Sequence, residues 1–153
     1  MFTYQNSFKM KKKILLLLLF LGTFANAQNW KTSFDEAKKQ AIAENKNILL
    51  VFSGSDWCAP CIKLDKKIWQ SEAFKKEASQ ELVLYKADFP KKKVNMLPTQ
   101  QVASNKKLAE LYNKSGNFPL VLLLNNSGKV LGITGYKNVS PKEYIQIIQS
   151  FDK

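Results

Sequence analysis

Two kinds of hydrophobic pattern alternate along residues 33–153. Apolar runs predict β-strands at residues 48–52, 82–87, 120–124 and 130–134. The first of these runs is apolar at every position, as expected of a central strand that is covered on both faces. The last two runs are separated by the turn sequence Asn125-Asn126-Ser127-Gly128, which predicts that they form an antiparallel pair.

Between these runs, apolar residues recur at intervals of three and four, which predicts amphipathic helices. Serine N-caps with a glutamate three residues later begin the first helix at Ser33 and the last at Ser140. Further helices are predicted from the segment 57–61 to Trp69, over residues 71–78, and over residues 99–114. The residues expected on the buried stripes include Phe34, Ala37, Ala41 and Ile42 in the first helix and Val102, Leu108, Leu111 and Tyr112 in the helix over 99–114.

Strands that are separated by helices favour parallel pairing, and the hairpin near the end adds an antiparallel edge. We therefore expect an α/β fold in which a central mixed sheet of about four strands has helices on both faces. The chain of 153 residues is long enough for one hydrophobic core and too short for two full domains. Residues 28–153 are interpreted as this single domain.

The first 27 residues have the pattern of a cleavable secretory signal. Lys11-Lys12-Lys13 precede an apolar run over residues 14–25, and Ala25-Asn26-Ala27 provides the small residues of a cleavage site. The run is well short of the roughly 20 residues that span a bilayer; the alternative interpretation is a buried hydrophobic helix. We expect cleavage after Ala27, export to the periplasm or an equivalent compartment, and no stable membrane insertion afterwards. Met10, directly before the lysines, is an alternative start.

The composition excludes several kinds of chemistry. The formal net charge is +12, and all 24 basic residues are lysine, so there is no arginine to clamp a phosphate or carboxylate. There is also no histidine, which excludes Ser-His-Asp and Cys-His catalysis within the chain. Two cysteines are too few for a structural zinc site, and the spread of the lysines predicts no nucleic-acid partner. The run Lys91-Lys92-Lys93 is interpreted as a solvated loop, with a docking patch for an acidic partner as the alternative.

The chemistry that remains is concentrated at Cys58-Ala59-Pro60-Cys61. Because this segment joins a strand to a helix, the first sulfur lies at a helix N-terminus, where the dipole and free N–H groups stabilise a thiolate. The second sulfur lies one turn further, close enough to form a disulfide, and Pro60 fits a first turn that needs no N–H from it. We expect Cys58 to attack, Cys61 to resolve the mixed disulfide, and Trp57 to shield the sulfur from part of the solvent.

Two other interpretations of the cysteine pair stay open. A structural disulfide would close only a four-residue span and would restrain the unfolded chain little. Two thiolates could instead bind a soft ion such as Cu(I), which would make the protein an exported metal carrier. The strand, the loop and the tryptophan that precede Cys58 favour redox chemistry, which needs neither a cofactor nor a bound metal.

The chain resembles the thioredoxin family over nearly all of residues 33–153. The resemblance rests on Trp57-Cys58-Ala59-Pro60-Cys61 and, further along the chain, on Asn117-Phe118-Pro119-Leu120. It implies a thioredoxin-like fold, a cis Phe118–Pro119 bond beside the cysteines, and activity as a thiol–disulfide oxidoreductase. The residues that the resemblance places in contact with the substrate are Trp57, Pro60, Phe118 and Pro119.

Three features depart from the pattern of that family. Thioredoxins carry a buried aspartate on the strand before the active site, whereas residues 48–52 contain no acid. We expect Lys86, Asp56 or water to handle the proton of the second cysteine instead; the alternative for Lys86 is a solvated lysine at a strand end. Phe118 replaces a small or β-branched residue, which predicts a more apolar substrate groove. The connection over residues 89–107 is longer than is usual in the family.

The residues between the cysteines favour a reducing or intermediate potential. Strong oxidants of this fold carry a histidine there, whereas Ala59 and Pro60 bring no charge. The expected partners are client proteins with disulfides and, because an exported reductant needs a source of electrons, a membrane electron donor. Oxidative folding or isomerisation in the same compartment is the alternative enzymatic function.

Overall fold

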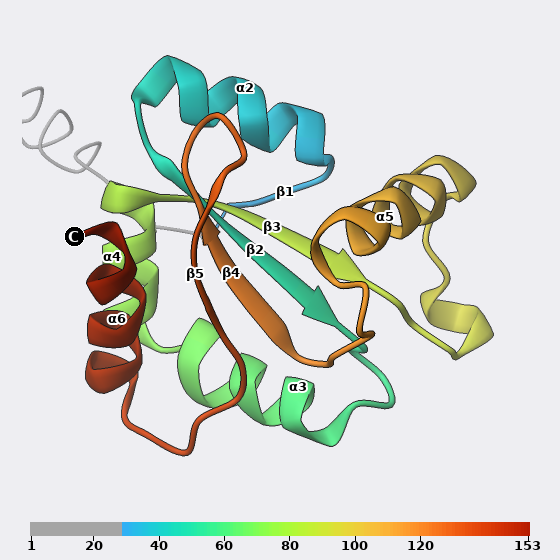
Figure 1. The fold of residues 1–153 in the computed structure, drawn as a ribbon. Coiled ribbons are helices and arrows are strands. Elements are labelled where there is room, and N and C mark those ends of the chain that lie inside the picture. The colour runs from blue at the N-terminus through green and yellow to red at the C-terminus, as the bar shows by residue number, and fades with distance from the viewer. Residues whose placement is uncertain (1–28) are drawn as a thin grey trace, which may run out of the picture.

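A five-stranded mixed sheet forms the centre of the protein (Figure 1). The structure, a computed structural model, describes residues 29–153. The strands are β1 (Trp30–Lys31), β2 (Asn47–Ser53), β3 (Leu82–Asp88), β4 (Leu120–Leu124) and β5 (Val130–Thr134), in the order β1-β3-β2-β4-β5. Strands β1, β2 and β3 are parallel, whereas β4 is antiparallel to both β2 and β5. The predicted mixed sheet and its antiparallel hairpin are thus confirmed.

Strand β1 is an addition that the hydrophobic pattern does not reveal, because two residues are too few to show an alternation. Trp30 lies opposite Leu84 of β3 and extends the sheet from four strands to five. The ring of Trp30 packs edge-on against that of Trp69, with 6.1 Å between the centroids. The extra strand therefore covers one edge of the core.

Helices cover both faces of the sheet (Figure 1). One face packs against α2 (Phe34–Glu44) and α5 (Thr99–Tyr112), and the other against α3 (Ala59–Leu64), α4 (Glu72–Glu81) and α6 (Pro141–Gln149). Single turns of 3-10 helix occupy Lys93–Asn95 and Ser150–Asp152. As predicted, α2 and α6 begin at serine caps, and Ser140 forms the complete capping box with Glu143.

The two faces of β2 contribute to separate cores. Ile48, Leu50 and Phe52 pack with α2 and α5, while Leu49 and Val51 pack with the helices of the other face. All five side chains are at most 1% exposed. Coverage on both faces is the reason that this strand is apolar at every position, and the interpretation as a central strand is confirmed.

Two of the expected core positions are wrong, since Ile42 is 61% and Leu111 is 69% exposed. The next residue along an α-helix is turned by about 100° around the axis, so Ile42 points away from the stripe that contains Ala41. Leu111 stands beside the stripe that contains the buried Leu108. Apolar character therefore indicates the helices correctly but overestimates the width of their buried stripes.

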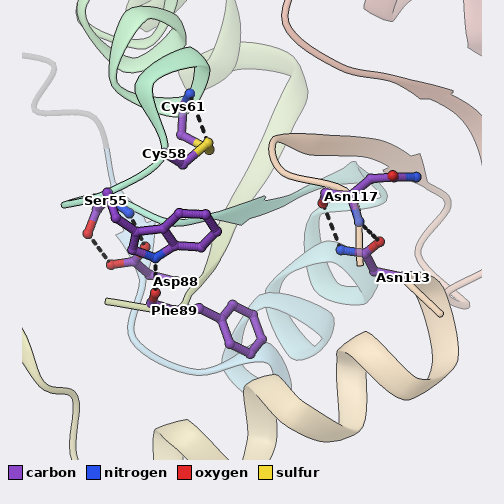
Figure 2. The surroundings of a disulfide bond; sticks show 8 residues. Ser55, Cys58, Cys61, Asp88, Phe89, Asn113 and Asn117 are labelled. Carbon is purple, nitrogen blue, oxygen red and sulfur yellow. Dashed lines mark hydrogen bonds between the residues drawn. A yellow bond between two sulfur atoms is a disulfide. The ribbon is translucent and has the colours of Figure 1, made fainter. Parts of the chain in front are cut away.

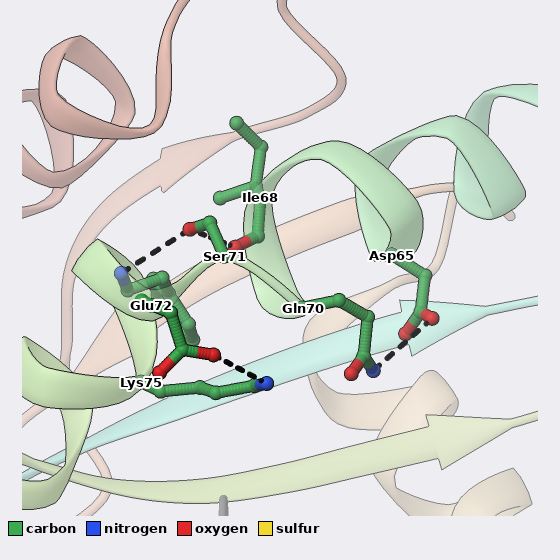
Figure 3. A network of polar contacts seen from close by, with 7 residues as sticks. Asp65, Ile68, Gln70, Ser71, Glu72 and Lys75 are labelled. Carbon is green, nitrogen blue, oxygen red and sulfur yellow. Dashed lines mark hydrogen bonds and ion pairs between the residues drawn. The ribbon is translucent and has the colours of Figure 1, made fainter.

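The helix after the cysteines changes its hydrogen-bonding pattern part of the way along. α3 continues directly as one turn of π-helix over Asp65–Trp69, and this turn places Trp69 in the core. Ser71 then begins α4: its Oγ donates to the carbonyl of Ile68 at 2.7 Å and accepts from the N–H of Phe74 at 3.2 Å (Figure 3). The π turn leaves the side chain of Asp65 half-buried on the side of β3.

The expected signal segment, residues 1–27, and the alternative start at Met10 lie outside the described residues. Within residues 29–153, no helix combines the length and the apolar character that crossing a membrane requires. The interpretation of residues 1–27 as a cleavable signal stays a prediction.

Candidate active site

The loop after β2 leads into α3 with Cys58 at the N-cap position. Cys58 and Cys61 form a disulfide, with their Cα atoms 5.2 Å apart (Figure 2). The Sγ atom of Cys58 accepts a hydrogen bond from the backbone N–H of Cys61 at 3.3 Å. In the reduced protein, the same N–H and the helix start would stabilise a thiolate at Cys58. Pro60 lies in the first turn, as the sequence predicts.

The side chain of Trp57 forms one wall beside the disulfide. Its indole Nε1 donates to the carbonyl of Phe89 at 2.7 Å, and its ring meets that of Phe118 edge-on at 5.4 Å between centroids. The ring also packs on the backbone of Gly54, where an added Cβ would come within 2.3 Å of it. Although Trp57 is 40% exposed, it is therefore held from three sides.

The second segment of the site is the turn before β4, where the Phe118–Pro119 bond is cis, as expected. Pro119 is buried, and Phe118 is half-buried against Trp57 and Phe89. Asn113, at the end of α5, fixes this turn with two hydrogen bonds. Its Nδ2 donates to the carbonyl of Asn117, and its Oδ1 accepts from the N–H of Asn117, both at 2.9 Å (Figure 2). The expected neighbourhood of the two motifs is confirmed through the contact of Phe118 with Trp57.

Asp56 binds the loop that follows β3. Its carboxylate accepts hydrogen bonds from the backbone N–H groups of Lys91 and Lys92, each at 2.9 Å, and from Nδ2 of Asn95 at 3.0 Å. These hydrogen bonds, led by the one from Lys91, lower the pKa of Asp56 below its ordinary value. Both carboxylate oxygens are thus engaged with this loop.

A second carboxylate, Asp88 at the end of β3, connects the loops that follow β2 and β3. It accepts from both the N–H and the Oγ of Ser55 (Figure 2). The carbonyl of Asp88 accepts from Nδ2 of Asn105 at 3.0 Å, and this fully buried amide also accepts from the hydroxyl of Tyr85 at 2.6 Å. The carboxyl ends of β2 and β3 are therefore fixed to each other and to α5.

Lys86 points to the same side of β3 as α3 and forms an ion pair. Its Nζ lies 2.9 Å from Oδ1 of Asp65 and 4.9 Å from the ring centroid of Trp30. Asp65 follows Cys61 by four residues, which is the spacing of side chains on one face of a helix. The pair is partly buried, with side chains 26% and 35% exposed.

The structure thus brings Phe118 against Trp57, the residue that precedes Cys58, and it directs Asp56 and Lys86 to separate partners. Sequence reasoning missed Asp65, Asp88 and Asn113. Of these three residues, only Asp65 could have been found from the sequence, because it is an acid one helical turn after Cys61. In residues 29–153, no three Cys, Asp or Glu side chains are grouped so that they could hold a metal ion.

Comparison with known proteins places this arrangement among redox proteins. The family model described as a thioredoxin-like domain matches residues 34–152. The disulfide bond reductase DsbH of Chlamydia pneumoniae is 36% identical over 126 residues, which cover 82% of this chain and 73% of that protein. The thioredoxin-related protein DsbJ of the same organism is 29% identical over 121 residues, covering 73% of this chain and 33% of that protein. A solved structure of a DsbH oxidoreductase superposes with a TM-score of 0.75 at 33% identity, covering 85% of this chain and 89% of that one.

Proposed function

Because the chain belongs to the thioredoxin-like family and is a protein thiol–disulfide oxidoreductase, we propose that it reduces disulfides of exported client proteins. The observation that carries the proposal is the Cys58–Cys61 disulfide at the N-cap of α3, walled by Trp57 and bordered by Phe118. The relative DsbH, which is named a disulfide bond reductase, supports the same direction of electron flow.

The reaction proceeds by two thiol–disulfide exchanges. The Cys58 thiolate of the reduced protein attacks one sulfur of the client disulfide, and the other client sulfur leaves as a thiolate. Cys61 then loses its proton and attacks Sγ of Cys58, which releases the second client sulfur and closes the Cys58–Cys61 disulfide. Two electrons have passed to the client, which takes up two protons. A membrane electron donor returns two electrons to the cysteine pair.

The residues between the cysteines support a reducing potential. A thioredoxin-like potential near −270 mV and a strong oxidant near −120 mV differ by about 150 mV, or roughly 7 kcal/mol of preference for the reduced form. A helix N-terminus contributes on the order of 1 kcal/mol. Ala59 and Pro60 add no charge beside the sulfurs, so the additional stabilisation that an oxidant needs has no source between the cysteines.

Proton transfer at Cys61 is assigned to Lys86 acting with Asp65, since this ion pair lies one helical turn beyond the buried sulfur. Asp56 is the weaker candidate, because its oxygens are engaged with Lys91, Lys92 and Asn95. Asp65→Asn should slow the resolution of a trapped mixed disulfide several-fold while the first attack by Cys58 keeps its rate. Equal slowing of both steps would indicate a merely structural role for the pair.

Export and the membrane donor complete the proposal. The lysines, the apolar run and Ala25-Asn26-Ala27 support removal of residues 1–27 by a signal peptidase. Mass spectrometry of the protein from the exported fraction should find Gln28 at the N-terminus. A chain that keeps residues 1–27 in the cytosol would overturn this part of the proposal.

The deciding experiment is a redox titration of Cys58 and Cys61 against glutathione and dithiothreitol, combined with insulin reduction. We expect a potential close to that of thioredoxin and dithiothreitol-dependent precipitation of insulin. A potential near −120 mV would instead indicate oxidative folding. Stoichiometric binding of Cu(I) without turnover would indicate a metal carrier.

A further inference from the structure

The loop over residues 89–98, here named the lysine loop, is fastened to the active site at several points. The carboxylate of Asp56 accepts from the backbone of Lys91 and Lys92, and Trp57 donates to the carbonyl of Phe89. Asn95 adds a third hydrogen bond to the same carboxylate. Both residues that hold the loop belong to the segment directly before Cys58. The lysine loop therefore has a fixed position relative to the attacking sulfur.

The lysine loop presents cationic and apolar side chains together. Lys91, Lys92 and Lys93 are all exposed, and two apolar side chains follow them, Val94 at 90% and Met96 at 57% exposure. The ion pairs among residues 29–153 involve Lys46, Lys75 and Lys86, so the three lysines of the loop keep their charge unpaired. Asp56, the acid next to them, binds backbone N–H groups rather than their ammonium groups.

One of these lysines reaches the wall of the site itself. Nζ of Lys91 lies 4.2 Å from the ring centroid of Trp57, and this ring meets Phe118 on the other segment of the site. The positive charge of the loop therefore extends to the place where a client chain has to lie when its disulfide meets Cys58. Because hydrogen bonds already order the backbone of the loop, a bound chain would not have to order it.

We propose that the lysine loop is a docking surface for an extended client segment that carries acidic residues and an apolar side chain beside the target disulfide. Carboxylates of the client pair with Lys91, Lys92 and Lys93, and its apolar side chain covers Val94 or Met96. The inference rests on the proposed reductase function and adds the class of client to it. A membrane with anionic lipids could also attract such a loop, but the connection of the loop to Trp57 and Asp56 favours the client chain.

Reduction of matched peptides tests this inference. Three peptides of equal length carry the same cystine and leucine, flanked by glutamate, glutamine or lysine, and each reacts with fully reduced protein under second-order conditions. We expect the glutamate peptide to react about tenfold faster than the glutamine peptide at low ionic strength, and the lysine peptide to react slowest. The preference should vanish near 1 M salt, where the screening length is about 3 Å.

Two variants with the same change in charge locate the effect. The quantity compared is the rate constant of the glutamate peptide divided by that of the glutamine peptide. Replacing Lys91, Lys92 and Lys93 by glutamine should bring this ratio to within about twofold of one, because charge steering is lost. Replacing the exposed Lys76, Lys142 and Lys153 by glutamine should keep the ratio of the wild type. Equal ratios in the two variants would overturn the docking surface and leave only an effect of net charge.

Two further measurements separate this inference from its alternatives. Reduction of the small neutral hydroxyethyl disulfide by the wild type tests the reductase function alone. If the wild type does not reduce this disulfide, the proposed function is overturned. If it reduces the disulfide but shows no preference among the peptides, only the docking surface is overturned. Vesicles of neutral and of anionic phospholipid test the membrane. Binding to anionic vesicles that requires the three lysines, without a preference among the peptides, would overturn the client inference in favour of a membrane surface.

Discussion

The centre of the sheet and the edge at which the parallel strands β2 and β3 end are held together by different forces. At the centre, the side chains of β2 are buried in two apolar cores, with α2 and α5 on one face and α3, α4 and α6 on the other. At the edge, where β2 and β3 end, side-chain polar groups bind the backbone of neighbouring segments. Asp56, Asp88 and Asn113 each do so, and they fix the loops that surround the disulfide.

This difference separates stability from function in the molecule. Apolar burial is non-directional, so the cores stabilise the fold without placing any one atom at the site. Hydrogen bonds are directional, and each polar residue at the edge sets the position of one segment around Cys58. Substitutions in the cores should therefore change the free energy of unfolding, and substitutions at the edge should change the reaction with clients.

The largest effect is expected at the sulfurs. Cys58→Ser should reduce insulin reduction to background, because a hydroxyl cannot attack a disulfide, while Cys61→Ser should trap a mixed disulfide with the client. Serine is a favourable N-cap, and the disulfide closes only a four-residue span, so the stability of Cys58→Ser should stay close to that of the reduced wild type. Turnover assays, trapping gels and urea titrations measure the three quantities. A turnover by Cys58→Ser above background would refute the assigned roles.

A core substitution should show the opposite behaviour. Leu50→Ala, at a position with no exposed surface, should lower the free energy of unfolding by about 2–5 kcal/mol. The folded fraction should keep its rate of insulin reduction, because Leu50 lies in the middle of β2, away from the end that leads to Cys58. Leu111→Ala on the exposed face of α5 is the matched control, with a change within about 0.5 kcal/mol. A loss of activity per folded molecule in Leu50→Ala would break the separation of the two regions.

The same division decides how much of the structure can be predicted from the sequence. The continuous run of β2, the hairpin turn and the serine caps of α2 and α6 report local forces, and the predicted elements follow them closely. The cysteine pair is found from its position between a strand and a helix, whereas the cis bond before Pro119 is found only by resemblance to a family. The partners of Asp56, Asp88 and Asn113 depend on which loops lie side by side, which no local pattern of residues records. Lys86 shows the same limit, since its ion pair with Asp65 forms only when the π turn after α3 lies beside β3.

Asn113 belongs to both regions, and its substitution should have an intermediate effect on each. Its side chain is 5% exposed and makes two hydrogen bonds with Asn117, which sets the turn before Phe118. Asn113→Ala should cost about 1–3 kcal/mol of stability, because two backbone groups lose their partner. Loss of the fixed turn should also lower kcat/KM for insulin several-fold. Asn125→Ala, which removes side-chain hydrogen bonds from the hairpin turn, is the control that should leave kcat/KM unchanged.

The smallest effect concerns the pH dependence of the contact between Asp56 and the lysine loop. The pKa of Asp56 is lowered in the folded protein, chiefly by the hydrogen bond from the N–H of Lys91. The hydrogen bonds of the carboxylate therefore stabilise the loop fully above the pKa of the unfolded chain, about 3.9, and they are lost as the pH falls through the lower pKa of the folded state. The amide resonances of Lys91 and Lys92 should titrate with a midpoint below about 3.9, and Asp56→Asn should abolish this titration.

The N–H of Ser140 is the internal control: it binds Glu143, whose pKa is lowered by hydrogen bonds from Ser140, and its own titration should persist in Asp56→Asn. A midpoint at or above the ordinary value of aspartate would show that the carboxylate does not hold the loop in solution, and the comparison between apolar centre and polar edge would then fail at the segment nearest to Cys58.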